Sequence, residues 1–369
     1  MSWTFVDDAD ALASALNELP PGPWGVDVER ADSLRYHRRA ALIQVGADGH
    51  AILVDPLALD DLEPVDRALD GRLCILHALI NDLVPLTRAG IAPATVADTS
   101  VGAALLGLPT GLAPLMEAVL GVQLAADKDR FQRADWERRP LANEMLEYAA
   151  GDVVDLPALW KAISARLAET NRIAWYDEEL AETIRVATDE SRSWKNVRGL
   201  GRLRPQGRAI LKALWQEREA IADTQDVAPN RILHDRVLLD LAAHPPETAE
   251  GLVKRSDRRR GVLRRNAERL FDAVLSGAAA APIERTGPGH RWNDEDRAAH
   301  DRMRHARSHV ARDIGIEPGV LCPGRLLWSA IAADPADGRA LCEAAGLRQW
   351  QTGLLQEALW EAYVGDAAP

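Results

Sequence analysis

The stretch WGVDVER, Trp24–Arg30, decides how the first part of this 369-residue chain folds. Apolar and polar residues alternate along it, a pattern typical of a β-strand with one buried face. The alternation points Val28 into the core and places Asp27 and Glu29 together on the opposite face. Two carboxylates therefore share one small patch of the expected sheet, and neither has a lysine or arginine two residues away.

Further strands and a helix follow this stretch. Ala41–Ala47 (ALIQVGA) and Ala51–Asp55 (AILVD) read as strands, and Asp48-Gly49 between them is a strong hairpin signal. We therefore expect an antiparallel meander. The short apolar run Arg72–His77 is typical of a buried strand, and Asn81–Gly90 is typical of a helix. Strands that alternate with helices predict a mixed α/β layer.

The rest of the chain reads as helical. From Val96 to about Ser164 the pattern is helical, and Leu141–Leu159 carries a nearly continuous apolar face. The uncharged stretch Thr99–Met116 contains two prolines and a glycine near its end, so we expect two short buried helices there rather than a membrane span. Gln206–Ala273 and Asn293–Tyr363 show helical segments without strand patterns, and each is preceded by a segment rich in linker residues.

Composition limits the class of protein. The chain is 47% hydrophobic and 27% charged, as in ordinary globular proteins. Its three cysteines are widely spaced and form no C-x-x-C pair, so they indicate neither a disulfide framework nor a zinc site. The first ten residues hold three aspartates and no basic residue, which is the wrong polarity for a secretory signal. We expect a cytoplasmic protein.

Charge is unevenly distributed along the chain. The net charge of −12 argues against a general nucleic-acid binder, which would need a basic surface. Residues 1–186 hold 16 Lys and Arg against 30 Asp and Glu, whereas the remainder holds 28 against 26. The acidic first half needs cations to meet a phosphate.

More acidic side chains are expected near Asp27 and Glu29. Asp82 falls in the first turn of a helix that follows a strand, where the helix dipole tolerates a carboxylate. Tyr148 and Asp152 lie four residues apart on an expected helix, so they share one side of it. Each feature alone is more often structural than catalytic, because acids on strands and at helix starts are common. A divalent metal is the natural counter-charge for carboxylates held this close together.

Three segments resemble the motifs of the DEDD exonuclease superfamily, tyrosine subtype, in its order and separation. They are Val26–Arg30 (VDVER), His77–Leu83 (HALINDL) and Tyr148–Val153 (YAAGDV). Asp98-Thr99 and the region from Leu120 through Lys128 to Asp135-Trp136 and Arg139-Pro140-Leu141 are similar to a further signature of the ribonuclease D family. Within the motifs, Arg30 departs from the family, in which many members carry an aromatic residue at this place.

The resemblance implies a fold and a domain organisation. We expect an α/β ribonuclease H-like catalytic domain, with a mixed sheet flanked by helices, followed by two all-α helical domains. Gln206 to about Val274 resembles an HRDC domain, the helical module shared by RecQ helicases and ribonuclease D, particularly at Trp215–Glu219 (WQERE) and Pro229–Leu233 (PNRIL). The expected organisation is a 3′→5′ exonuclease domain over 1–186, a linker over 187–205, an HRDC domain over 206–276, a linker over 277–290 and a second HRDC-like domain over 291–369.

The resemblance also implies roles for the catalytic set Asp27, Glu29, Asp82, Tyr148 and Asp152. Asp27, Glu29 and Asp152 would hold a first divalent cation, with Asp27 bridging to a second cation on which Asp82 acts directly or through water. Oxygen ligands favour Mg²⁺ or Mn²⁺ for both. Tyr148 would orient the attacking water.

Seven basic residues are candidates for nucleic-acid contacts: Arg30, Lys128, Lys254, Arg255, Arg258, Arg259 and Arg260. Lys254–Arg269 holds eight basic and two acidic residues, a bias that favours a phosphate-contacting surface over a solvated helix face. Lys128 contacts the phosphate of the scissile strand or is an ordinary surface lysine, and the sequence does not separate the two.

The function implied is a metal-dependent 3′→5′ exoribonuclease that acts on RNA with a single-stranded 3′ end and releases nucleoside 5′-monophosphates. Maturation of tRNA or of other stable RNA is the expected setting. A 3′→5′ DNA exonuclease is the nearest alternative, since the same carboxylates serve DNA proofreading, and a non-catalytic nucleic-acid-binding protein is the second. We expect no membrane and no protein partner.

Overall fold

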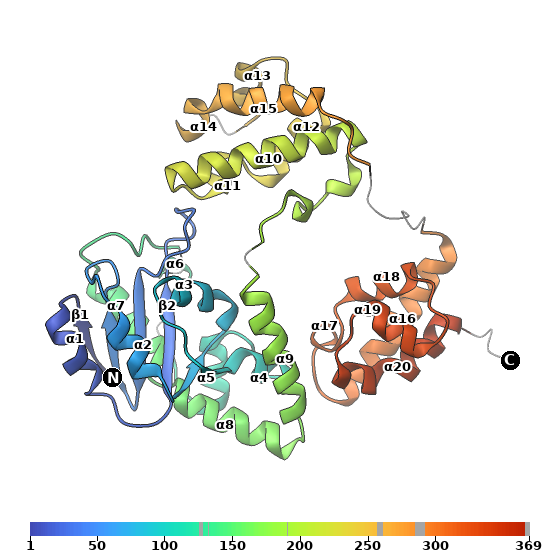
Figure 1. The fold of residues 1–369 in the computed structure, drawn as a ribbon. Coiled ribbons are helices and arrows are strands. Elements are labelled where there is room, and N and C mark those ends of the chain that lie inside the picture. Colours follow the sequence, from blue (N-terminus) through green and yellow to red (C-terminus); the bar gives the residue numbers. More distant parts are fainter. Residues whose placement is uncertain (125–127, 132, 190, 257–260, 285–291, 366–369) are drawn as a thin grey trace.

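The computed structural model describes residues 1–124, 128–131, 133–189, 191–256, 261–284 and 292–365. Figure 1 shows three units along the chain: a sheet covered by helices, drawn in blue to green, and two helical units, drawn in yellow to orange and in orange to red. The α/β unit with its mixed sheet and the helical remainder agree with the expected fold class.

A six-stranded mixed sheet forms the centre of the first unit, with the strand order β1-β4-β3-β2-β5-β6. The strands are β1 (Ser2–Val6), β2 (Trp24–Glu29), β3 (Leu42–Ala47), β4 (His50–Val54), β5 (Leu73–Leu76) and β6 (Thr95–Asp98). β2, β3 and β4 form the expected antiparallel meander, whereas β1, β5 and β6 pair in parallel with their neighbours. Asp48 and Gly49, with φ of 49° and 81°, make the hairpin turn between β3 and β4.

Two strands were not predicted, and both lie at the edges of the sheet. β1 pairs with β4, whose residues lie nearly fifty positions further along the chain. β6 has four residues, and the expectation of helix from Val96 onward was wrong there, because helix begins only at Thr99. A strand this short carries too little alternation to show a period of two, and its pairing with β5 decides its conformation.

Helices cover both faces of the sheet. They are α1 (Ala9–Leu16), α2 (Glu63–Leu69), the 3₁₀ helix η1 (Leu79–Asn81), α3 (Leu83–Arg88), α4 (Thr99–Leu105), α5 (Leu112–Leu120), α6 (Lys128–Phe131), α7 (Asn143–Val153), α8 (Leu156–Glu169) and α9 (Ile173–Ala187). The apolar side chains of α1, α2 and α3 pack with Val26 and Val28 on one face, and those of α4, α5, α7 and α8 form a second core. Gly25 allows α7 to lie directly against β2, because a Cβ there would meet the carbonyl oxygen of Val153 at 2.2 Å.

The helical region of the first unit contains more and shorter helices than its apolar pattern indicates. The apolar face expected over 141–159 is shared by α7 and α8, and α8 starts with Pro157 in its first turn, where a missing N–H costs nothing. The uncharged stretch 99–116 forms α4 and the start of α5, as expected. In the part of the chain that the structure describes, no helix is both long enough and apolar enough to cross a membrane.

The second unit is a bundle that contacts the loop after β2. It contains η2 (Trp194–Asn196), η3 (Leu200–Arg202), α10 (Pro205–Gln225), α11 (Pro229–Ile232), α12 (Asp235–Ala243), α13 (Ala249–Arg255), α14 (Gly261–Arg265) and α15 (Ala267–Ala279). α15 continues three residues into the segment expected to be a linker from 277. Asp226 at the end of α10 accepts hydrogen bonds from the backbone N–H groups of Tyr36 and His37, each at 3.1 Å. The two units therefore meet beside β2.

The third unit packs against the helices of the first. It contains α16 (Asp294–Asp313), α17 (Pro318–Leu321), α18 (Gly324–Ala332), α19 (Gly338–Ala345) and α20 (Gln349–Val364). Trp350 stacks on Trp175 of α9 with ring centroids 4.9 Å apart and donates its indole N–H to Glu179 at 2.7 Å. The buried apolar residues of the third unit belong to the same cluster as those of α4, α5, α7 and α8.

Candidate active site

The alternation of β2 presents Asp27 and Glu29 on the face that α7 covers. Val28 between them is 5% exposed and packs in the opposite core, as the sequence predicts. β2 is a central strand that pairs with β3 from Gly25 to Glu29 and with β5 at Trp24 and Gly25, so its backbone is held by β3 along the segment that carries both acids. The two carboxylates therefore project from a rigid support.

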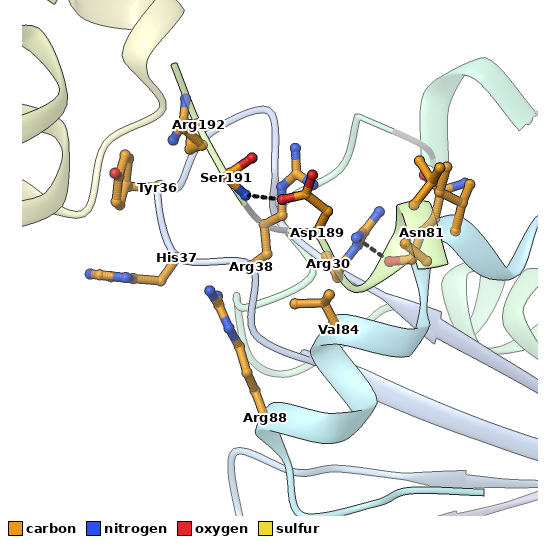
Figure 2. Close-up of a pocket in the computed structure, with 13 residues that line it drawn as sticks. Arg30, Tyr36, His37, Arg38, Asn81, Val84, Arg88, Asp189, Ser191 and Arg192 are labelled. Carbon is orange, nitrogen blue, oxygen red and sulfur yellow. Dashed lines mark hydrogen bonds between the residues drawn. The ribbon is translucent and has the colours of Figure 1, made fainter. Parts of the chain in front are cut away.

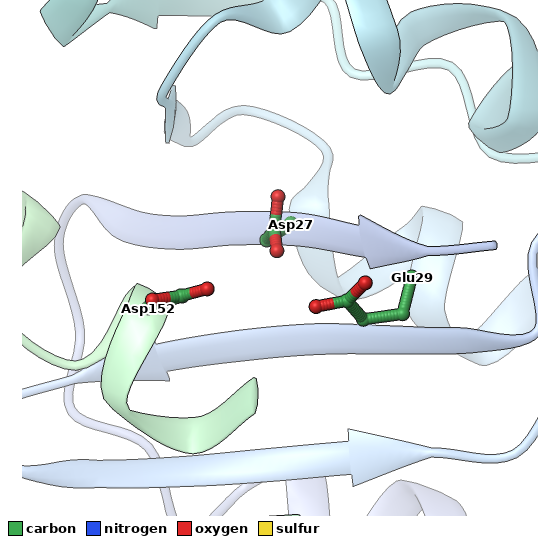
Figure 3. A group of neighbouring side chains, drawn as sticks. All are labelled: Asp27, Glu29 and Asp152. Atoms are coloured by element: carbon green, nitrogen blue, oxygen red, sulfur yellow. The ribbon is translucent and has the colours of Figure 1, made fainter. Parts of the chain in front are cut away.

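Helix α7 brings a third carboxylate to this pair. One carboxylate oxygen from each of Asp27, Glu29 and Asp152 lies within 4.8 Å of the others (Figure 3). Tyr148 is one helical turn before Asp152, and its hydroxyl hydrogen-bonds to the Asp152 carboxylate. The structure thus gathers residues from β2 and α7 that are more than a hundred positions apart in the sequence.

Asp82 lies at the junction of η1 and α3, in the wall of the same cleft. The cleft has a volume of about 480 Å³ and is lined by all four carboxylates together with Tyr148. Asp82 is only 3% exposed, and its backbone N–H donates a hydrogen bond to the carbonyl oxygen of Leu79. It does not belong to the group of three that lie within 4.8 Å of each other, so it stands beside this group.

Negative charge dominates the electrostatics of the cleft. Burial, and next the carboxylates of Asp27 and Asp152, raise the pKa of Glu29 well above its ordinary value. Burial, and next Asp27, do the same for the pKa of Asp82. Arg30 opposes both shifts without reversing them. Carboxylates arranged in this way favour a divalent cation, whose charge would restore their ordinary ionisation.

The phenol of Tyr148 is held in its protonated form. Burial, followed by the negative charges of Asp152 and Glu29, raises the pKa of Tyr148 far above its usual range. Its ring packs against Phe131 and Trp136, with centroids 5.0 and 6.3 Å away. Tyr148 is therefore placed to donate a hydrogen bond in the cleft, and it cannot serve as a base near neutral pH.

Asp98 holds the turn that carries Asp82. Its buried carboxylate accepts hydrogen bonds from the backbone N–H groups of Ala78 at 3.1 Å and Leu79 at 2.8 Å, and it also caps α4. Ala78 has φ 62° and ψ 53°, a left-handed conformation that costs an alanine about 1–2 kcal/mol. The Asp98 carboxylate stabilises this strained backbone just before η1.

Arg139 fastens the segment that precedes α7 to the sheet. Its guanidinium forms two hydrogen bonds with the carboxylate of Asp55, at 2.5 and 2.6 Å, and donates to the carbonyl oxygens of Ala41 and Trp136 at 2.6 Å each. Asp55 is 3% exposed, and it follows directly after β4. This bidentate pair fixes the chain that leads into the helix bearing Tyr148 and Asp152.

Residues that support the site were harder to find in the sequence than those that line it. Asp98 and Arg139 lie within the segments that resemble the family signature, and no local pattern marks Asp55. An acid just before a helix, such as Asp98 before α4, is a recognised N-cap signal. No comparable signal links Asp55 with Arg139, because 84 positions separate them.

The expected nucleic-acid contacts remain predictions. Arg30 lines the cleft, donates to the carbonyl oxygen of Asn81 and pairs with Asp32 at 3.3 Å, so its guanidinium connects the end of β2 to the turn before Asp82. Lys254 pairs with Glu250 at 2.8 Å, and Arg255 donates to the carbonyl oxygen of His244. Arg258, Arg259 and Arg260, and the side chain of Lys128, lie outside the described part of the structure.

Comparisons with known proteins identify the domains of the chain and its relatives. Residues 3–168 match the family model of the 3′-5′ exonuclease domain, and residues 207–274 match that of the HRDC domain. Ribonuclease D of Pseudomonas paraeruginosa is 33% identical over 283 residues, which cover 74% of each chain. A protein of solved structure from Bifidobacterium adolescentis is 26% identical, with a TM-score of 0.76 over 98% of this chain and 97% of that one.

A further solved structure has a similar fold. RNase D of Escherichia coli, described as an exoribonuclease involved in structured RNA processing, is similar with a TM-score of 0.74 over 98% of both chains, at 24% identity. The order of the units is therefore shared along the whole chain. With its carboxylate cleft, its exonuclease and HRDC domains and a relative this similar, the chain belongs to the ribonuclease D family of 3′→5′ exonucleases.

Proposed function

We propose that Asp27, Glu29 and Asp152 hold one divalent cation and that Asp27 and Asp82 hold a second, with which this 3′→5′ exoribonuclease hydrolyses RNA. The observation that carries the proposal is the approach of three carboxylates to within 4.8 Å, with a fourth in the same cleft. The products would be nucleoside 5′-monophosphates, released one at a time from the 3′ end.

The donor set fits a hard divalent cation. The ligand atoms offered by these four residues are all carboxylate oxygens, which suits Mg²⁺ or Mn²⁺ better than softer metals. When bound, such cations activate the attacking water and stabilise the negative charge that develops on the phosphate and the leaving oxygen. The raised pKa values of Glu29 and Asp82 in the metal-free protein mean that a bound cation would stabilise the ionised form of both carboxylates.

Tyr148 would position the attacking water. Because its pKa is raised, the phenol keeps its proton and acts as a hydrogen-bond donor. Its hydroxyl is directed by Asp152, and its ring packs against Phe131 and Trp136. Loss of the hydroxyl would therefore disturb the orientation of the water while leaving the carboxylates in place.

We assign RNA with a single-stranded 3′ end as the substrate, and tRNA or another stable RNA precursor as its setting. Support comes from the ribonuclease D relatives and from the name of the Escherichia coli protein, which links that enzyme to structured RNA. A DNA exonuclease would use the same carboxylates, so the two substrates must be compared directly.

The test follows shortening of 5′-labelled RNA and DNA strands of the same sequence, in EDTA, Mg²⁺ and Mn²⁺. We expect a ladder of RNA products shortened from the 3′ end only when a divalent cation is present, and slower shortening of DNA. Asp152→Ala should lower the rate at least about a thousandfold. Tyr148→Phe should lower it about a hundredfold without loss of metal binding.

Glu147→Ala is the matched control, because Glu147 is an exposed carboxylate on the same helix, next to Tyr148. It should keep the rate of the unaltered protein. Full activity of Asp152→Ala would refute the assignment of the ligands. RNA that stays intact in Mg²⁺ and also in Mn²⁺ would refute the proposed exoribonuclease activity.

A further inference from the structure

A buried amide next to the carboxylates lacks a hydrogen-bond partner among the residues that the structure describes. The side chain of Gln44, on β3, is 0% exposed. Neither its amide nitrogen nor its amide oxygen is bonded to any group of the described chain. A buried polar group without a hydrogen bond is destabilising and rare in native proteins. The packing of the sheet therefore gives no reason for an amide at this position.

Strand pairing places Gln44 beside one of the carboxylates. In the antiparallel pair of β2 and β3, the residue opposite Gln44 is Asp27. Side chains that oppose each other in such a pair project from the same face of the sheet, with Cβ atoms about 4.5–5.5 Å apart. Gln44 thus lies on the carboxylate face of the sheet, and its amide is within reach of the Asp27 side chain.

The other positions next to Gln44 on this face are apolar. Leu42 and Gly46 come before and after it on the same face of β3, and Leu53 of β4 opposes it from the other side. Leu42 and Leu53 belong to the apolar core to which α7 contributes. Of the four positions that adjoin Gln44 in the sheet, only that of Asp27 carries a polar side chain.

Two other carboxylates of the cleft are supported by hydrogen bonds. The hydroxyl of Tyr148 bonds to the carboxylate of Asp152. Arg30 donates to the carbonyl oxygen of Asn81, directly before Asp82, and so holds the backbone that carries this acid (Figure 2). Groups that orient the ligands of a metal in this way typically change its affinity or the activity by about 10–100-fold.

We propose that the amide of Gln44 holds the Asp27 carboxylate in the orientation that binds divalent cations, by donating a hydrogen bond from Nε2 to a carboxylate oxygen. The proposal rests on the proposed function, because it takes Asp27 to be a cation ligand. An ionised carboxylate only accepts hydrogen bonds, so the nitrogen of the amide must face it. Gln44 is not among the described residues that line the cleft, so it is a positioning residue that acts through Asp27.

Cation binding and this hydrogen bond should stabilise each other. The amide is not bonded to Asp27 in this structure, and rotation about the side-chain torsions of both residues would bring the two groups together. A hydrogen bond to an ionised carboxylate is about twice as strong as one between neutral groups. By linkage, a hydrogen bond that favours the binding orientation of Asp27 raises the affinity for the cation, and the bound cation favours the hydrogen bond.

The test measures cation binding in the absence of RNA. Full-length protein is titrated with Mn²⁺, with the free ion followed by electron paramagnetic resonance, and thermal midpoints are recorded in EDTA and in Mn²⁺. Gln44→Met replaces the amide by an unbranched apolar side chain of similar length. We expect the Kd for Mn²⁺ to rise about 10–100-fold. The midpoint in EDTA should stay equal or rise, because an amide without a partner is removed, and the increase caused by Mn²⁺ should shrink.

Ile43→Val is the matched control. Ile43 is the fully buried neighbour of Gln44 on β3, and its side chain packs in the opposite core. Removal of one methyl group there should lower the thermal midpoint in EDTA and in Mn²⁺ alike and leave the affinity for Mn²⁺ unchanged. A general disturbance of the sheet is thereby separated from an effect on Asp27.

A crystal structure of the unaltered protein with Mn²⁺ gives a direct check. Nε2 of Gln44 should lie about 2.9–3.0 Å from a carboxylate oxygen of Asp27. A separation that excludes a hydrogen bond would overturn the proposal, and so would an equal Kd for Mn²⁺ in Gln44→Met and the parent protein. A Gln44 that only binds a buried water would lose stability equally in EDTA and in Mn²⁺ when replaced, with no change in Kd.

Hydrolysis separates this proposal from the proposed function. If the affinity for Mn²⁺ depends on Gln44 and RNA is never shortened, the proposed function fails while the role of Gln44 stands. If RNA is shortened and the affinity does not depend on Gln44, only the role of Gln44 fails. A parent protein that does not bind Mn²⁺ would overturn both.

Discussion

Replacing Asp98 by asparagine tests how the turn before Asp82 is held in place. Asp98 is fully buried, and its two carboxylate oxygens divide their partners. Oδ1 accepts from the N–H of Ala78 and from the N–H and hydroxyl of Ser100, whereas Oδ2 accepts from the N–H of Leu79 at 2.8 Å. An asparagine can keep the first set, but its NH₂ group must then face the N–H of Leu79.

The cost follows from that one lost contact. A hydrogen bond to a charged group contributes about 1.5–3 kcal/mol, and a buried N–H without an acceptor costs about 1–3 kcal/mol more. Since the site can relax, we expect Asp98→Asn to lower the free energy of unfolding by about 2–4 kcal/mol. The left-handed Ala78, which costs about 1–2 kcal/mol, loses part of its support, so the turn and Asp82 should shift. A small displacement of a group that holds a catalytic cation should lower kcat at least about tenfold.

The assay combines urea unfolding with RNA shortening, using one preparation of each variant. Asp61→Asn is the control, because the Asp61 carboxylate accepts one exposed hydrogen bond, from the N–H of Glu63 at 2.9 Å. This replacement should cost no more than about 0.5 kcal/mol. Additional Mn²⁺ should restore part of the activity of Asp98→Asn without restoring its stability. Asp98→Asn with the unfolding free energy of the control and an unchanged kcat would refute the reasoning.

Two further predictions concern the carboxylates and their support. Glu29→Gln should abolish RNA hydrolysis yet raise the thermal midpoint of the metal-free protein. Because the folded-state pKa of Glu29 is raised, the contribution of this carboxyl to stability in EDTA is fully present below its ordinary pKa of about 4 and is lost as pH rises. The difference between the midpoints of the variant and the unaltered protein should therefore grow with pH and vanish in Mg²⁺. A constant difference between pH 5 and 8, measured by scanning fluorimetry, would contradict this. Gly25→Ala should lower the free energy of unfolding by roughly 3 kcal/mol, because its Cβ would lie 2.2 Å from the carbonyl oxygen of Val153, whereas Gly353→Ala, in open space on α20, should be neutral or stabilising in the same denaturant titration.

Local patterns in the sequence determined the parts of the site that lie within single elements. Alternation along β2 put Asp27 and Glu29 on one face, and the helical repeat put Tyr148 one turn before Asp152 on α7. Asp48-Gly49 predicted the hairpin, because its positive φ angles suit a tight turn. Each of these features depends on neighbours within four residues, and such neighbours are what a periodic pattern records.

The tertiary structure alone decided which elements meet. Edge strands β1 and β6 form because β4 and β5 offer unpaired backbone groups, and nothing in four or five residues of sequence shows this. Asp98 reaches the turn before Asp82 only because β5 and β6 pair in parallel, and the loop 30–39 after β2 is held by Asp226 of the HRDC domain, almost two hundred positions away. Contacts between distant segments arise from the packing of whole elements, so the carboxylate motifs could be read from the sequence, whereas their supports could not.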